Sequence, residues 1–388
     1  MESFDFYSLE LLLSQDERAL LGTYRAWLAD EVAPLVNRHW QAATFPHEIL
    51  PGLAALGPAG QPLQGYGCPG RSWLFEGLLA MEIATVDPSI ATFYGVHCEL
   101  AMESIYYCGS EEQRERWIRP MSRWELIGAF GLTEPDVGSG TAGGLTTTAR
   151  REGDEWVING QKKWIGNATF ADVVVIWARD VDDNQVKGFV VEKGTPGFTT
   201  TTIEGKMALR IVQNAHITLT DVRVSEDNRL QNANSFKDTA QVLRLTRAGV
   251  AWMAVGCMRG AYLHCLEYST QRQQFGRPIA GFQLVQDLLS RMLANITASA
   301  AMCTRLSQLQ DEGIAEDPHS ALAKMFCTTR MREAVGWARE LMGGNGILLD
   351  HNVARFVADA EAIYSYEGTR EMQSLIVGRA VTGHSAFV

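Results

Sequence analysis

Cysteine is scarce in this chain, and its cysteines are not spaced for metal binding or for a disulfide framework. The 388 residues include seven cysteines, an odd number, scattered from Cys68 to Cys327 without a Cys-x-x-Cys pair. This distribution excludes the ligand spacing of a zinc ribbon and the dense cysteine pattern of a small secreted domain. We therefore expect reduced thiols, no metal site and a cytoplasmic protein.

Clustered positive charge and long apolar runs are missing as well. The chain has 34 Lys and Arg against 45 Asp and Glu, a formal net charge of −11. A nucleic-acid surface is therefore not expected, because phosphate binding relies on clustered cations. No apolar run is long enough to cross a bilayer, and the first five residues are acidic and lack a signal-peptide core. We expect a soluble protein with a small-molecule partner.

The two commonest nucleotide-binding fingerprints are also missing. No G-x-G-x-x-G segment directly follows a predicted strand, and no G-x-x-x-x-G-K-[ST] segment occurs. The β-branched runs gather between about residues 126 and 224, with helical patterns on both sides, so strands and helices do not alternate. The sequence predicts a mainly helical α+β fold. Its expected parts are an N-terminal helical domain (1–125), a middle antiparallel β domain (126–235) and a four-helix-type C-terminal bundle (236–388).

Local patterns place the main elements. Runs of β-branched residues predict strands at 172–178, 188–192 and 216–222. Asn159-Gly160 predicts a tight hairpin turn, because this pair accepts positive φ angles. Ser110 and the acidic residues after it predict a helix start. Apolar residues at helical spacing predict long helices at 236–271, 281–311 and 319–341.

A carboxylate stands between the last two predicted helices, at Glu367. Gly368 permits backbone angles that a helix forbids, and the hydroxyl of Thr369 can cap the next helix. Glu367 would then be held on a fixed corner, as a catalytic base requires. The alternative is that Glu367 simply ends a helix.

Five segments in fixed order give the sequence a family resemblance. They are 130–140 (FGLTEPDVGSG), 163–167 (KWIGN), 271–278 (QRQQFGRP), 341–346 (LMGGNG) and 366–369 (YEGT). In this order, with helical regions around a β region, they resemble the acyl-CoA dehydrogenase and oxidase superfamily of flavoproteins. The resemblance covers nearly the whole chain. It is closest to the glutaryl-CoA dehydrogenase branch and to the short-chain acyl-CoA oxidase of plant peroxisomes.

The resemblance implies a cofactor, a reaction and a set of site residues. FAD would be the cofactor, Glu367 would remove the α-proton of an acyl-CoA thioester, and flavin N5 would accept hydride from the β-carbon. Arg272 would reach the FAD pyrophosphate from the neighbouring subunit of a homotetramer, and an electron-transfer flavoprotein would accept the electrons. The implied cofactor-binding residues are Phe130, Leu132, Thr133, Ser139, Trp164, Ile165, Gly166, Arg272, Gln274, Phe275, Gln283, Met342, Gly343, Gly344, Thr369 and Glu371. The implied substrate-binding residues are Ser139, Arg247, Ala91, Gly95, Tyr366 and Gly368.

Two positions depart from the pattern of the glutaryl-CoA dehydrogenases. Where those enzymes pair an arginine with the far carboxylate of the substrate, the matching residue here is Ala91. A buried carboxylate without a cation is costly, so we expect a short, uncharged acyl-CoA substrate. Gly166 stands where the dehydrogenases usually have Thr, which removes a hydroxyl and would open a space beside flavin N5.

Alternatives to a dehydrogenase stay open. The expected space at Gly166 makes a short-chain acyl-CoA oxidase that uses dioxygen the runner-up, although the chain ends in Ala386-Phe387-Val388, which is not a peroxisomal signal. A non-catalytic scaffold that keeps the flavoprotein fold is an alternative of another class, and the intact Glu367 corner argues against it. Arg247 fits either an orienting role beside the base or a helix surface.

Overall fold

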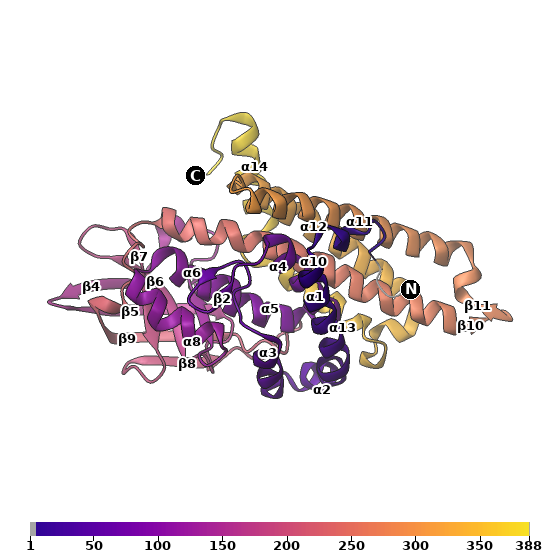
Figure 1. Ribbon diagram of the computed structural model, residues 1–388, viewed down its shortest axis with the longest axis horizontal. Coiled ribbons are helices and arrows are strands. Elements are labelled where there is room, and N and C mark those ends of the chain that lie inside the picture. The colour runs from indigo at the N-terminus through magenta and orange to yellow at the C-terminus, as the bar shows by residue number, and fades with distance from the viewer. Residues whose placement is uncertain (1–4, 388) are drawn as a thin grey trace.

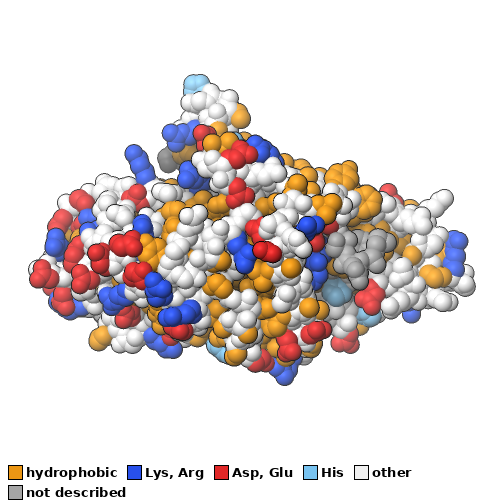
Figure 2. Space-filling view, in the orientation of Figure 1, with side chains coloured by type: hydrophobic (Ala, Val, Ile, Leu, Met, Phe, Trp, Pro, Cys, Tyr) orange, Lys and Arg blue, Asp and Glu red, His pale blue; other side chains and the backbone are white. Residues whose placement is uncertain are grey.

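The computed structural model describes residues 5–387 and is elongated, with a β-sheet region at one end and a small hairpin at the other (Figure 1). Residues 1–4 and Val388 lie outside the described residues, and so do the sequence predictions made for them. Within residues 5–387, no helix is long and apolar enough to cross a membrane. Acidic side chains gather over the sheet end on the face shown in Figure 2, with lysine and arginine among them.

The N-terminal region is helical, as predicted. Its most buried helix is α4 (Trp73–Val86), which has apolar residues on all sides and lies against the long helix α10. The helix start predicted at Ser110 is confirmed, and Ser110 and Gln113 form a capping box there. The other elements are η1 (Leu9–Leu12), α1 (Gln15–Trp27), η2 (Leu28–Val32), α2 (Ala33–Ala42), η3 (His47–Ile49), α3 (Leu50–Leu56), β1 (Gln64–Gly65), β2 (Cys68–Pro69), α5 (Pro88–Gly95), η4 (Val96–Ala101), α6 (Met102–Cys108), α7 (Glu111–Gln113), η5 (Arg114–Ile118) and α8 (Arg119–Ser122).

The middle region is a seven-stranded sheet with the order β3-β6-β4-β5-β9-β8, and β7 pairs with β6. The predicted strands correspond to β6 (Val173–Asp180), β7 (Val186–Glu192) and β9 (Ala215–Ser225). The expectation of an antiparallel sheet needs correction, because β6 pairs in parallel with both β3 and β4. The remaining elements are β3 (Gly128–Gly131), α9 (Thr141–Gly144), β4 (Thr148–Glu152), β5 (Glu155–Ile165), β8 (Phe198–Thr202) and η6 (Glu226–Asn228).

The predicted hairpin at Asn159-Gly160 is wrong, because β5 runs through this pair without turning. The register of β5 against β9 shifts between Ile158 and Gly160, which marks a β-bulge. Gly160 has φ of 149°, and a Cβ there would lie 2.6 Å from the Cα of Thr147. The glycine is therefore needed for a close backbone approach rather than for a turn.

The C-terminal region is a bundle of long helices, as predicted. The predicted starts and ends lie within two residues of α10 (Phe236–Gln271), α11 (Gln283–Asp311) and α12 (Asp317–Leu341). Helix α14 (Arg370–Thr382) packs against α12 and projects from the bundle toward the C-terminus, and the hairpin of β10 (Gln273–Gln274) and β11 (Arg277–Pro278) forms the far end of the molecule (Figure 1). The remaining elements are η7 (Ile279–Gly281), η8 (Gly343–Ile347), η9 (Leu349–His351) and α13 (Val353–Ser365).

Asp359 of α13 joins the three regions. Its carboxylate accepts hydrogen bonds from Ser89 Oγ at 2.9 Å and Trp40 Nε1 at 3.1 Å, both in the N-terminal region. It also accepts one from the backbone N–H of Leu209 at 2.7 Å, in the middle region. The three parts therefore pack as one body.

Candidate active site

The corner between α13 and α14 has the backbone that its sequence predicted. Glu367 has φ of 51° and Gly368 has φ of 94°, both in the left-handed region. Thr369 caps α14, because its Oγ1 accepts a hydrogen bond from the N–H of Met372 at 3.4 Å. A glutamate in left-handed backbone is uncommon and marks a position that the surrounding structure enforces.

Side chains from three helices hold this corner. The hydroxyl of Thr246, on α10, donates a 2.5 Å hydrogen bond to Glu367 Oε2. Lys324 Nζ, on α12, donates to the carbonyl oxygen of Gly368 at 2.7 Å. Gln373 Nε2, on α14, donates to the carbonyl oxygens of Glu367 at 3.1 Å and Gly368 at 3.0 Å. The Glu367 carboxylate is thus fixed relative to the bundle.

Burial and charge act in opposite directions on Glu367. Burial raises the pKa of its carboxyl, while the Thr246 hydrogen bond and the nearby cations Lys324 and Arg247 lower it, with a net rise. Burial lowers the pKa of Lys324 to about 7. Arg247 is largely buried and lies 3.7 Å from Asp317 Oδ1, so it acts on Glu367 through its charge. A carboxylate with a raised pKa is suited to accept a proton.

The expected substrate side of the corner is formed by α5 and α10. The Tyr366 hydroxyl donates to Met253 Sδ at 3.4 Å, and a Cβ at Gly95 would lie 2.6 Å from Met253 Cε. Met253 and Thr246 are seven residues apart on α10, so they share one face of the helix. Ala91 is fully buried on α5, one turn before Gly95. The structure therefore brings Tyr366, Gly95 and Glu367 to one place.

The segments expected to meet the flavin lie at the ends of strands β3 and β5. Phe130 and Leu132 are buried, and Thr133 Oγ1 donates to the carbonyl oxygen of Lys163 at 2.7 Å. Trp164, the next residue, has a left-handed backbone with φ of 69°, and its side chain is 55% exposed. Ile165 is buried. An exposed indole on enforced backbone presents an aromatic face on which a flat ring can stack.

The space expected beside Gly166 is partly filled. A Cβ at this position would lie 3.1 Å from Val96 Cγ2 and 3.5 Å from Val212 Cγ1. The expectation that glycine opens this place is corrected by the valine of η4, which packs against it. Next in the chain, Asn167 Nδ2 donates to the carbonyl oxygen of Phe93 at 3.2 Å. Gly166 and Asn167 therefore rest on α5 and η4, and α5 also meets Met253, the residue that Tyr366 contacts.

Several other residues implied by the family resemblance lie away from the Glu367 corner within a single chain. Phe275 is 92% exposed on the hairpin at the far end of the molecule (Figure 1). Near the same end of α10, Asn345 Nδ2 donates to the Tyr268 hydroxyl at 2.9 Å, which fixes the glycine-rich turn. Among the cofactor-binding residues that the resemblance implies, Met342 is buried and Thr369 is half-buried. The exposed ones are Ser139, Arg272, Gln274, Phe275, Gln283, Gly343, Gly344 and Glu371.

Three residues at the corner were missed in the sequence. Thr246 directly precedes Arg247, and its hydroxyl gives no pattern of its own. Lys324 is a lone cation in the apolar run Ala321-Leu322-Ala323-Lys324-Met325-Phe326, a signal that could have found it. Gln373 is fully buried although glutamine is usually exposed, which only the fold reveals.

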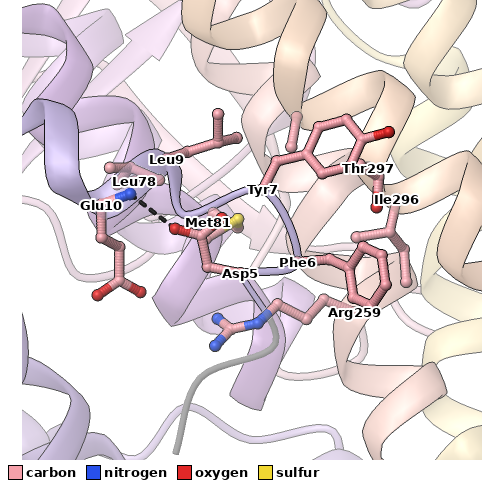
Figure 3. A pocket seen from close by; sticks show the side chains of 11 residues that line it. Asp5, Phe6, Tyr7, Leu9, Glu10, Leu78, Met81, Arg259, Ile296 and Thr297 are labelled. Carbon is pink, nitrogen blue, oxygen red and sulfur yellow. Dashed lines mark hydrogen bonds between the residues drawn. The ribbon is translucent and has the colours of Figure 1, made fainter.

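A separate cavity lies between the N-terminal segment and helices α4, α10 and α11 (Figure 3). Its wall includes Phe6, Tyr7, Met81 and Arg259, and the N–H of Glu10 closes one side by donating to Asp5 Oδ2 at 2.7 Å. The residues that line it include none of those implied for flavin or thioester binding. It carries no role in the chemistry of the corner.

Family models match nearly the whole chain. They describe the acyl-CoA dehydrogenase N-terminal domain over residues 14–125, the middle domain over 129–222 and the C-terminal domain over 236–382. The chain belongs to the acyl-CoA dehydrogenase family and is an oxidoreductase.

Individual relatives agree with the family models. A probable acyl-CoA dehydrogenase of Bacillus subtilis is 32% identical over 373 residues, 95% of this chain and 98% of the relative. A short-chain specific acyl-CoA dehydrogenase of Megasphaera elsdenii is 30% identical, over 90% of this chain and 94% of the relative. The crystal structure of a glutaryl-CoA dehydrogenase from Mycobacterium smegmatis in complex with FADH2 is similar with a TM-score of 0.95 and 34% identity, covering 99% of both chains.

Proposed function

We propose that this protein is an FAD-dependent dehydrogenase that converts a short acyl-CoA thioester to the trans-2-enoyl-CoA, with Glu367 as the base. The observation that carries the proposal is the Glu367 carboxylate itself. It is fixed by Thr246 at 2.5 Å on a left-handed corner, and its pKa is raised. A fixed and poorly solvated carboxylate suits removal of the weakly acidic α-proton of a thioester.

The residues present fit the cofactor of this family. The exposed Trp164 face is available to stack on a flat ring, and the loop after β3 is tied to the end of β5 by Thr133. When bound, FAD supplies the acceptor for the hydride from the β-carbon. The chain's own residues hold the base, support the ring and exclude water around the thioester.

The substrate is proposed to lack a terminal carboxylate. Ala91 provides no cation at the position where the glutaryl-CoA dehydrogenases carry an arginine, and it is fully buried. A carboxylate placed there would lose its hydration without gaining a partner. A dicarboxylic acyl-CoA is therefore disfavoured, in contrast to the glutaryl-CoA dehydrogenase of similar fold.

The electron acceptor is proposed to be an electron-transfer flavoprotein rather than dioxygen. Val96 fills much of the space that Gly166 leaves, which limits the approach of dioxygen at this point. A homotetramer is proposed because Arg272, Gln274 and Phe275 are exposed at the end of the molecule opposite the sheet. There they could serve the flavin of a neighbouring subunit. A cytoplasmic location is proposed from the scattered, unpaired cysteines.

A panel of acyl-CoA thioesters tests the proposal. The purified yellow protein is mixed with each thioester without oxygen, and loss of flavin absorbance is followed. Turnover is then measured in air with and without an artificial acceptor, while peroxide is assayed. We expect bleaching by short acyl-CoAs and turnover that depends on the acceptor. Stoichiometric peroxide at the rate of turnover would indicate an oxidase instead, and a protein unable to bind FAD would indicate a scaffold.

Glutaryl-CoA and butyryl-CoA make the sharpest pair in this panel. Because Ala91 offers no charge partner, butyryl-CoA should bleach the flavin much faster than glutaryl-CoA. The measurement is the bleaching rate at saturating thioester, with carbon dioxide release as a second readout. Equal bleaching with release of carbon dioxide would contradict the proposed pocket.

A further inference from the structure

Three buried carboxylates line a small cavity beside the Glu367 corner. They are Glu76 of α4, Glu99 of η4 and Glu103 of α6, with 4%, 4% and 1% of their surfaces exposed. Glu99 comes close to Gly249, and Trp73 and Trp252 form part of the same wall. The cavity measures about 10 Å³, room for about one water-sized group. Its lining is completed by Gly77, Leu245, Ala248, Ser307 and Gln310.

These carboxylates differ from Glu82 and Glu134, two other buried acids of the molecule. Glu82 is paired with Arg259 at 2.6 Å and Arg25 at 2.7 Å, and Glu134 is paired with Lys162 at 3.0 Å. Among residues 5–387, no Lys, Arg or His nitrogen lies within 4 Å of the carboxylates of the cavity. The chain therefore pairs Glu82 and Glu134 with cations and holds Asp359 by three hydrogen bonds, whereas it leaves this group without a cation.

Hydrogen bonds from the protein satisfy the group only in part. The Tyr94 hydroxyl donates to Glu76 Oε2 at 3.1 Å. Glu99 Oε1 and Glu103 Oε2 are buried and accept no hydrogen bond from the described part of the chain. Two buried and unpartnered oxygens in the wall of one cavity are costly unless a ligand supplies donors or positive charge. The arrangement is not that of a metal site, since no group of three His, Cys, Asp or Glu side chains within residues 5–387 could hold an ion.

The cavity adjoins the place where the thioester is expected. A Cβ at Gly249 would lie 2.1 Å from Glu99 Oε2, so only glycine leaves room for this carboxylate against α10. Gly249 is one turn from Thr246, which holds the base. On the other side, a Cβ at Gly95 would lie 3.6 Å from Glu99 Oε2 and 2.6 Å from Met253 Cε, the methionine that Tyr366 contacts. Glu99 therefore lies directly behind the wall formed by Gly95 and Met253.

We propose that the carboxylates of Glu76, Glu99 and Glu103 select an acyl thioester whose far end carries a primary ammonium group, a cation whose head is about the size of one water molecule. The inference rests on the proposed dehydrogenase function and replaces the expectation of an uncharged acyl chain. A cation in the cavity would meet the unpartnered oxygens of Glu99 and Glu103. It would also face Trp73 and Trp252, whose aromatic rings favour positive charge.

The test compares 5-aminopentanoyl-CoA with pentanoyl-CoA in the FAD-loaded protein. We expect kcat/KM for flavin reduction to favour the amino substrate by about tenfold or more, as is typical for a desolvated charge pair. Glu99→Gln should reduce this ratio by a similar factor, and Glu103→Gln should reduce it as well. Glu31→Gln, on the exposed side of η2, serves as the control and should leave the ratio unchanged. The ratio is measured within each variant, so a loss of folded protein does not move it.

Three outcomes separate this inference from the function on which it rests. A wild-type protein that reduces its flavin with pentanoyl-CoA as well as with 5-aminopentanoyl-CoA contradicts the cation site alone. So does a preference that Glu99→Gln and Glu103→Gln both leave intact. If no acyl-CoA in the panel bleaches the flavin, the proposed dehydrogenase function fails, and the cation site fails with it.

Discussion

One hydroxyl donor and two cations near Glu367 lower the pKa of its carboxyl, whereas burial raises it. The resulting pKa sets the pH range in which Glu367 can act as a base. Thr246 donates directly to its carboxylate, whereas Lys324 and Arg247 act through charge. A base works in its deprotonated form, so activity should be lost as the pH falls through the raised pKa of Glu367. Lys324 is the cation whose removal leaves the hydrogen bond from Thr246 in place.

Lys324→Met should move the pH profile of flavin reduction to higher pH. The Lys324 cation lowers the pKa of Glu367, so its removal raises that pKa further and leaves less carboxylate at a given pH. The measurement is the rate of anaerobic bleaching as a function of pH. Lys187→Met is the matched control, because Lys187 pairs with Asp183 at 2.7 Å in the sheet, away from the corner. An unchanged profile in Lys324→Met would contradict the charge coupling.

At the residue scale, the corner at Glu367, Gly368 and Thr369 was predictable from the sequence. A helix cap and a positive φ angle depend on neighbouring residues alone. Glu99 and Lys324 were missed because a charged residue in a helical pattern usually indicates a solvated face. Only the packing of α4, α10 and α12 shows that these side chains are buried.

At the scale of elements, a buried ion pair fixes the loop that follows β3. Lys162 on β5 is fully buried and donates to Glu134 Oε1 at 3.0 Å and to the carbonyl oxygen of Leu132 at 3.0 Å. Glu134 also accepts the N–H groups of Thr146 at 2.7 Å and Thr147 at 2.9 Å. Against the effect of burial, the Lys162 cation and these bonds lower the pKa of Glu134 to about 2.

Glu134→Gln should therefore destabilise the protein by about 3–5 kcal/mol, because it leaves the Lys162 cation buried without a counter-charge. The free energy of unfolding from denaturant titration measures the loss. The double variant Glu134→Gln with Lys162→Met removes both charges and should recover part of that stability. A double variant less stable than the single one would show that the pair is not the cause.

The contact between the end of β5 and η4 gives a second prediction. A side chain at Gly166 would press on Val96, so Gly166→Thr should cost about 1–3 kcal/mol through overpacking. Val96→Ala provides the missing space, and the double variant should regain most of the lost stability. Thermal unfolding of the two variants and their combination measures this coupling. Full stability of Gly166→Thr alone would mean that Val96 yields without cost.

Long helices were predictable because their apolar periodicity is local, as α10, α11 and α12 show. The partners of β6 were not, since parallel pairing with β3 and β4 depends on contacts far apart in the chain. Asn159-Gly160 gives the local signal of a turn, and β5 passes through it because Gly160 packs closely on Thr147. Tertiary packing overrode local propensity there.

At the scale of the whole molecule, the hairpin of β10 and β11 lies at the end opposite the sheet (Figure 1). Arg272 is exposed there, where it cannot reach the Trp164 region of its own chain. If it binds the flavin of a neighbouring subunit, FAD retention should depend on assembly.

Arg272→Ala should weaken FAD binding by removing two parallel donors to a phosphate group. The ratio of flavin to protein after gel filtration measures retention, and native mass determination follows the assembly. Arg277→Ala in the same hairpin is the control, since that guanidinium lies 4.3 Å over the Phe282 ring and is held within its own chain. Undiminished FAD in Arg272→Ala, or a monomer that retains FAD, would contradict this arrangement.

The most direct measurement is anaerobic flavin reduction in wild-type protein and in Glu367→Gln. Glutamine keeps the volume and most of the hydrogen bonding of Glu367, so the variant should stay yellow and bind its acyl-CoA. Without a base, reduction should slow by roughly 10²- to 10⁴-fold. Reduction at nearly the wild-type rate by the best substrate would contradict the assignment of Glu367 as the base.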